Sequence, residues 1–248
     1  MSMAPTVLYP LTLVGLIHHV LKTQSGTATT TLIICSSRDT FLQQLSQSLQ
    51  QEDDLDDHED QNDQLQNLAI PTLHNLLTTR HIKLAFCASV QSLLAYLTAH
   101  GRDAPRDTVQ CAPGARLFLI NPLSLHASTL SFSAQGLSRT FAAATETTLK
   151  SGVALHVVEC QTGSGMAEQR EEEDVDMSDA NEENKAGEEV EEELSNPWEM
   201  EVSILNVSAR RFSSNSGERS WAGRTVKAKR IAARWFQFQQ LHEEQKGQ

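Results

Sequence analysis

The stretch RLFLINPLSLHASTLSFSAQGLSRTFAAATETTLKSGVALHVVEC, residues 116–160, decides the fold class. Its first run, Arg116–Asn121, is apolar along most of its length, which predicts a strand buried on both faces. A helix is predicted from Ala134, with Gly152 as its stop, and the strand Val153–Glu159 follows at once. The helix residues predicted to face the core are Leu137, Phe141 and Leu149. A strand, a helix and a second strand in this order predict a parallel βαβ unit.

Further strands and helices precede this unit. TATTTLIICSS, residues 27–37, is rich in β-branched side chains and predicts a strand, as does Ile82–Cys87. The helices predicted from apolar periodicity are Arg38–Gln50 with Phe41, Leu42, Leu45 and Leu49 on one face, Leu65–Thr79 with Leu68, Leu73, Leu76 and Leu77, and a segment from the cap Ser89 through Leu97. The apolar stretch Leu8–Leu21 is a further helix candidate. Four strands alternating with helices predict an α/β fold with an open, mostly parallel sheet.

The charge of the chain is divided unevenly between acidic blocks and the remainder. The formal charge is −12 over 248 residues, but residues 168–193 carry −12 and residues 52–63 carry −8, which leaves +8 for the rest. Such acidic segments bury too little apolar surface to fold alone. The predicted organisation is a core over residues 1–165 with an acidic loop at 51–64, a disordered acidic insert at 166–196, C-terminal strands at 197–240 and a tail at 241–248.

The cysteines and the N-terminal residues bear on cofactor binding and on contact with a membrane. Cys35, Cys87, Cys111 and Cys160 have no metal-binding spacing, and three of them close apolar runs, so we expect reduced core thiols, no metal and no other cofactor. The N-terminal apolar stretch is shorter than the roughly 20 residues that span a bilayer, and it lacks a basic leader. We therefore expect no contact with a membrane.

The C-terminal region combines predicted strands with basic side chains. WEMEVSILNVSARRF and RTVKAKRIAARWFQF, residues 198–212 and 224–238, predict an antiparallel pair, and part of the second could be helical. Cations neutralise phosphates and aromatic rings stack on unpaired bases. The candidate nucleic-acid-binding residues are Arg210, Arg211, Arg219, Trp221, Arg224, Lys227, Lys229, Arg230 and Arg234. In the alternative interpretation the tryptophans, Trp235 included, are core or interface anchors and the charges form a solvated face.

Residues 116–160 are similar, in the order and spacing of their elements, to the core of RecA-type recombinases and their eukaryotic paralogues. TLIICSSRDTFLQQLSQSL and IKLAFCASVQSLLAYL resemble the two strand and helix units that precede that segment in the family. The resemblance implies a RecA-like three-layer core over most of the chain outside the acidic blocks.

The sequence departs from that family at the positions that handle nucleotide. No GxxxxGK[S/T] phosphate loop precedes Thr31, so the loop is degenerate. Asn121 stands where the family has the acid that organises magnesium, and a neutral amide does not replace a carboxylate there. Ser36, Ser37 and Arg38 stand where the resemblance places the catalytic glutamate. We therefore expect a chain that is not an enzyme.

The resemblance implies an accessory, ATPase-deficient recombinase paralogue similar to Shu-complex subunits. Such a nuclear subunit would pair with other RecA-like chains and support homologous recombination by binding single-stranded DNA or by stabilising a recombinase filament. The alternative is a RecA-like scaffold subunit of the Elongator complex, which acts in wobble-uridine modification of transfer RNA in the cytoplasm. A third hypothesis is a nucleotide-binding enzyme with an aberrant site.

Overall fold

The structure is a computed structural model that describes residues 4–24, 26–54, 72–100, 114–161, 196–205 and 224–241. In chain order its elements are β1 (Thr6–Tyr9), α1 (Leu13–Thr23), β2 (Thr30–Ile34), α2 (Arg38–Asp54), α4 (Leu73–Thr79), β3 (Ile82–Phe86), α5 (Val90–His100), β4 (Arg116–Ile120), α6 (Pro122–Ala127), α7 (Ala134–Ser151), β5 (Ala154–Val158), the 3-10 turn η2 (Pro197–Glu199), β6 (Glu201–Ser203), β7 (Thr225–Lys227), α9 (Ala228–Ala232) and β8 (Gln237–Gln240).

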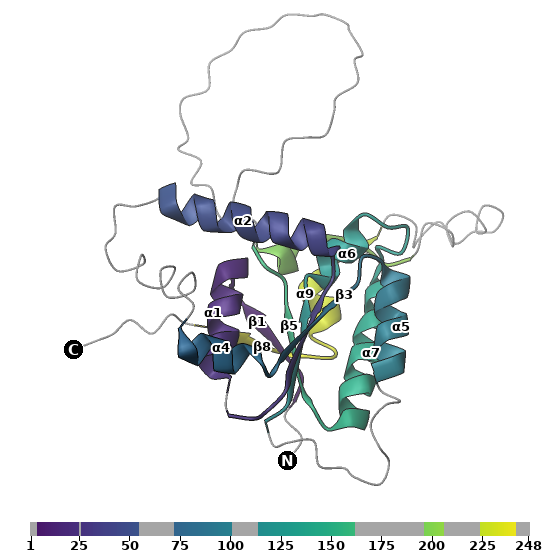
Figure 1. The fold of residues 1–248 in the computed structure, drawn as a ribbon. Coiled ribbons are helices and arrows are strands. Elements are labelled where there is room, and N and C mark those ends of the chain that lie inside the picture. The colour runs from purple at the N-terminus through teal and green to yellow at the C-terminus, as the bar shows by residue number, and fades with distance from the viewer. Residues whose placement is uncertain are drawn as a thin grey trace, which may run out of the picture.

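Six strands form one sheet in the order β3-β2-β4-β5-β1-β8, and every neighbouring pair in it is parallel. Strands β6 and β7 form a separate antiparallel pair. Helices cover both faces of the large sheet, with α1, α2 and α4 on one side and α5 and α7 on the other (Figure 1). The predicted α/β fold with a mostly parallel sheet is confirmed, and its three layers are consistent with a RecA-like core.

Alternating strand residues divide the interior into two cores. On β4, Leu117 and Leu119 join the cluster under α5, α7 and α9, whereas Phe118 and Ile120 join the cluster under α1 and α2. Successive side chains of a strand point to opposite faces, and in a doubly covered sheet both faces are apolar. The prediction that this apolar run is a strand buried on both faces is therefore confirmed.

Helix α7 follows the predicted course at both ends. The Ser133 hydroxyl accepts a hydrogen bond from the Gly136 N–H at 3.1 Å, and Gly152 ends the helix at φ 66°. Leu137 and Phe141 are fully buried as predicted, but Leu149 is 63% exposed, so its assignment to the core was wrong. Threonines face inward in this part of the helix instead, because their hydroxyls bond back to helix carbonyls, as Thr148 does to Ala144 at 3.1 Å.

The N-terminal apolar stretch contains a strand that the sequence analysis missed. Leu8 and Tyr9 belong to β1, which lies between β5 and β8 in the sheet, and the helix α1 begins only at Leu13. The helix prediction for Leu8–Leu21 was therefore wrong in its first part. Pro10 separates the two elements because proline lacks the N–H that a helix interior requires.

The next two helices, α2 and α4, add detail to the predictions. Helix α2 runs to Asp54 and so enters the acidic loop predicted at 51–64, since glutamine and glutamate are good helix formers. Leu42 is 46% exposed, whereas Phe41, Leu45 and Leu49, predicted on the same face, are partly buried. Helix α4 exposes Leu73, Leu76 and Leu77, the described leucines of the predicted helix Leu65–Thr79. Residues 55–71, with Leu68, lie outside the described part of the chain.

The C-terminal segments are more varied than two paired strands. The antiparallel pair is confirmed as β6 with β7, and the second segment continues into helix α9 and then strand β8. Strand β8 pairs in parallel with β1 and forms an edge of the large sheet. Residues 162–195, which include most of the predicted acidic insert, lie outside the described residues. None of the described helices is long and apolar enough to cross a lipid bilayer.

Candidate functional site

The carboxyl ends of parallel strands meet at one edge of the sheet, which is where open α/β proteins bind ligands. In this chain the segments that follow β1, β2, β4 and β5 converge there. They comprise residues 10–12, residues 35–37, Asn121 and residues 159–161. We therefore take this edge as the candidate functional site.

The turn between β1 and α1 is only three residues long, Pro10, Leu11 and Thr12. The Thr12 side chain accepts a hydrogen bond from the Gly15 N–H at 3.0 Å, and the Leu11 carbonyl accepts one from the Gln161 N–H at 2.9 Å. A phosphate loop instead needs a long glycine-rich turn whose free backbone N–H groups surround the phosphates. This turn is too short to surround a phosphate, and the Gly15 N–H already donates to the Thr12 side chain.

Asn121 connects the ends of two neighbouring strands. It adopts the left-handed conformation at φ 57°, and its side-chain Oδ1 accepts a hydrogen bond from the Cys160 N–H at 2.8 Å. Its own N–H donates to the Val158 carbonyl at 2.8 Å. Asparagine tolerates this backbone conformation better than most residues. The amide that stands at the magnesium-acid position of the resembled family therefore holds β4 against β5.

Glu159 is a buried carboxylate that the sequence analysis did not single out. Its side chain accepts hydrogen bonds from the Leu123 N–H at 2.9 Å, from the Ser124 N–H at 2.8 Å and from the Ser124 hydroxyl. Burial raises the pKa of Glu159 to about 7, although these hydrogen bonds lower it. The signal available in the sequence was an acid closing the apolar strand HVVEC.

Two thiols lie near this carboxylate. Burial raises the pKa of the Cys35 and Cys160 thiols, and the neighbouring Glu159 charge raises both further. Burial also raises the pKa of Cys87. A protonated thiol is a poor nucleophile and a poor metal ligand. The three described cysteines are free, and within the described ranges no group of three metal-ligating side chains comes together.

The Glu159 carboxyl predicts a pH-dependent stability. Its pKa is about 7 in the folded chain and near 4.5 ordinarily, so between these values the folded state holds a proton that the unfolded state has released. Stability from this group is therefore complete below pH 4.5 and falls as the pH rises to 7, by on the order of 3 kcal/mol. Urea unfolding at pH 5 and pH 7.5 should show that Glu159→Gln loses this decline.

The comparison must be made between the two proteins at each pH, because buried histidines act in the opposite direction. Burial lowers the pKa of His156 to about 4, so its contribution to stability grows as the pH rises toward 6.5. Subtracting the free energy of unfolding of Glu159→Gln from that of wild type at each pH cancels the contribution of the histidines. Equal slopes for the two proteins would show that Glu159 does not titrate in this range.

The serines after β2 serve the start of a helix. The Ser37 hydroxyl accepts a hydrogen bond from the Thr40 N–H at 3.1 Å, which is the geometry of an N-terminal cap. Ser36 donates to the Ser37 carbonyl at 3.2 Å, and Arg38 is exposed in the first turn of α2. These residues stand where the resemblance placed a catalytic glutamate, and here they begin α2.

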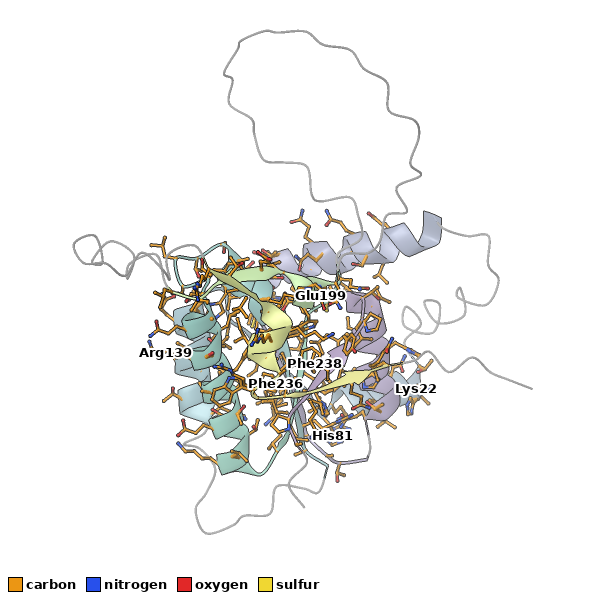
Figure 2. The ribbon with its side chains drawn as sticks, turned by 180° about the vertical axis from the view of Figure 1, so that it is seen from behind. Lys22, His81, Arg139, Glu199, Phe236 and Phe238 are labelled. Carbon is orange, nitrogen blue, oxygen red and sulfur yellow. The ribbon has the colours of Figure 1, made fainter. Side chains whose placement is uncertain are left out.

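The described candidates for nucleic-acid binding lie on or beside β7 and α9. Lys227 contacts the Glu199 carboxylate at 2.7 Å and Lys229 contacts it at 3.6 Å. The Lys229 ammonium also lies 5.9 Å and 5.8 Å from the ring centres of Tyr9 and Phe238. Figure 2 shows Glu199 and Phe238 on this side of the molecule. One acid therefore offsets part of the charge that the sequence analysis assigned to a nucleic-acid surface.

The remaining candidates divide into exposed cations and residues outside the described ranges. Arg224, Arg230 and Arg234 are exposed. The ring of Trp235 packs against the core under α7 and α9, as the alternative interpretation of this tryptophan has it. The candidates that lie outside the described ranges are Arg210, Arg211, Arg219 and Trp221.

No protein-family model matches the chain, and no curated protein matches it at a significant level.

Proposed function

We propose that this chain is a non-catalytic subunit that assembles with other RecA-like chains. The observation that carries the proposal is the turn of three residues between β1 and α1, which stands where a RecA-like enzyme would hold phosphates. Asn121 and Ser37, which occupy two further positions of nucleotide chemistry in the resembled family, make structural hydrogen bonds instead. The fold is thus retained without the groups that hydrolysis needs.

Nucleotide binding gives the most direct test of the non-catalytic part. A ligand that binds only the folded state raises the melting temperature with its concentration. We expect millimolar ATP with magnesium to leave the melting temperature of the purified chain unchanged, measured by differential scanning fluorimetry. A rise of several degrees that requires magnesium would favour the third hypothesis, an enzyme with an aberrant site.

Assembly is supported by the edges of the sheet. Among the described strands, β3 pairs only with β2 and β8 pairs only with β1, so each has one side without a strand neighbour. Open strand edges are places where another chain adds or packs. For the biological process we propose homologous recombination in the nucleus, in which the subunit binds single-stranded DNA or stabilises a recombinase filament through a RecA-like partner.

The Elongator scaffold is the second candidate, and one observation favours it. Lys227 and Lys229 share Glu199, and Trp235 packs into the core, so these three residues are less available to phosphates and bases. A role in the assembly of a ring of RecA-like subunits needs no such surface. In that case the chain would act in the cytoplasm, in wobble-uridine modification of transfer RNA.

Affinity purification of the tagged chain from its native cell separates the two processes. Recovery of a recombinase paralogue in stoichiometric amount, with sensitivity to DNA-damaging agents on deletion, would support recombination. Recovery of Elongator subunits, with loss of wobble-uridine modification on deletion, would support the scaffold. A chain that purifies as a monomer without any RecA-like partner would contradict both assignments.

A further inference from the structure

Helix α4 carries an exposed apolar stripe that the described part of the chain leaves uncovered. Leu73, Leu76 and Leu77 are 79%, 55% and 60% exposed. Residues spaced by three and four positions lie on one face of a helix. Arg80, the exposed cap residue seven positions after Leu73, continues the same face. Single exposed leucines are ordinary, but a contiguous group of them marks an interaction surface.

A fourth leucine extends this stripe onto the edge strand. Leu84 of β3 is 55% exposed, and it lies on the same face of the strand as Ile82 and Phe86, which pack against the core under α1 and α2. Helix α4 packs against α1 and lies on the same side of the sheet (Figure 1). The exposed leucines of α4 and β3 are therefore on one face of the molecule. We call Leu73, Leu76, Leu77 and Leu84 the leucine surface.

Helix α4 gains little support from the described part of the chain. It has seven residues, and Thr78 is its only buried side chain. Helices this short are marginal in water, and in proteins they depend on tertiary packing of an apolar face. The apolar face of α4 is the exposed one. A partner that covers it would supply the packing that the rest of the described chain does not.

The charges around the leucine surface indicate the chemistry of that partner. The described segment 72–100, which contains both α4 and β3, has no aspartate or glutamate. Both of its fixed cations are exposed: Arg80 lies at the end of α4, whereas Lys83 alternates with Leu84 on β3 and so points to the opposite face of the strand. Opposite charges at the rim of an interface steer association and select the partner. The matching surface is therefore apolar at its centre and acidic at its rim.

We propose that the leucine surface is the docking site for a partner subunit that presents an apolar, acid-rimmed segment to α4 and β3. This inference deepens the proposed assembly function and rests on it, because the partner is taken to be the RecA-like chain. Leucine side chains at the centre would exclude water, and Arg80 would pair with a carboxylate of the partner. Docking here would also cover the free edge of β3.

The test uses full-length variants and the purified partner recovered from native cells. Leu73→Asp combined with Leu76→Asp removes the apolar stripe, and Arg80→Glu reverses the charge at its end. The matched control is Leu149→Asp, because Leu149 is also 63% exposed but lies on α7, across the sheet. We expect each of the first two changes to weaken the Kd by at least about tenfold, and the control to leave it unchanged. Melting temperatures close to that of wild type would show that all variants fold.

The possible results separate this inference from the proposed function. If every variant binds the partner with equal affinity, the docking site is overturned, but the proposal of a RecA-like partner is not affected. The recovered partner could instead be a protein that is not RecA-like. If both the double leucine variant and Arg80→Glu then fail to bind it, the docking site is supported and the RecA-like assignment is overturned. Recovery of no stoichiometric partner overturns both. If the leucine changes weaken binding but Arg80→Glu does not, the proposal of an acidic rim on the partner is overturned.

Two other occupants of the surface would also overturn the inference. If the purified chain forms dimers that the leucine changes dissolve, the occupant is a second copy of the chain. If the leucine changes and deletion of residues 52–63 lower the melting temperature of the isolated monomer by similar amounts, the occupant is the chain's own acidic block. Sedimentation velocity and thermal unfolding of the isolated variants distinguish these results.

Discussion

Replacing Trp198 by alanine is expected to lower the free energy of unfolding by about 3–5 kcal/mol. Trp198 is 1% exposed and belongs to the core under α5, α7 and α9. Its ring meets that of Phe238 edge to face, with the centres 5.5 Å apart. Alanine would remove this contact and leave a cavity between η2 and β8. Urea unfolding followed by far-ultraviolet circular dichroism measures the loss.

Trp198→Phe provides the control for this change. The indole N–H of Trp198 has no hydrogen-bond partner among the described residues, so phenylalanine gives up volume but no described hydrogen bond. We expect the phenylalanine variant to lose distinctly less stability than the alanine variant. If alanine costs less than about 0.5 kcal/mol, which is the usual range for surface positions, the short segment 196–205 is not part of the cooperative core.

Replacing Gly136 by alanine is expected to destabilise the chain by about 2–3 kcal/mol, although alanine is the better helix former. A Cβ on Gly136 would lie 2.1 Å from the backbone oxygen of Ser131. The helix preference for alanine is worth only about 1 kcal/mol, so the steric conflict decides the sign. The Ser131 carbonyl cannot move freely because it accepts a hydrogen bond from the Ser133 N–H at 2.8 Å.

The control for Gly136→Ala is the neighbouring substitution Gln135→Ala. Gln135 is exposed in the first turn of α7, so alanine there should change stability by less than about 0.5 kcal/mol. Thermal unfolding of the two variants under the same conditions makes the comparison. A Gly136→Ala protein as stable as wild type would mean that the turn from Ser131 to Ser133 relaxes at little cost.

The sequence predicted those elements whose signals are local. The apolar runs of β2, β4 and β5, the helix start at Ala134 and the stop Gly152 lie where their residue types place them, because each depends on neighbouring residues. The short strand β1 was missed because its four residues merge with the apolar helix that follows. Its place between β5 and β8 depends on pairings with residues about 150 and 230 positions away, which no local pattern reports.

The sequence identified residues of the candidate site, but it did not predict the contacts that they make. Asn121 and Ser37 were singled out by position, but the hydrogen bond of Asn121 to the Cys160 N–H joins residues 39 positions apart. The role of Glu159 depends on the N–H groups of α6 and on burial, and both exist only after folding. The pairing of Lys227 and Lys229 with Glu199 likewise brings together residues separated by the segment 206–223 and by β6.

The sequence by itself determined the α/β class, the parallel βαβ order and the absence of a GxxxxGK[S/T] phosphate loop before Thr31, because alternation, chain order and missing residue types can be read without coordinates. Tertiary structure alone decided which leucines are buried. Leu137 and Leu149 lie on the same predicted helix, yet only Leu137 is covered. Periodicity gives the face of a helix, whereas burial depends on whether another element lies against that face.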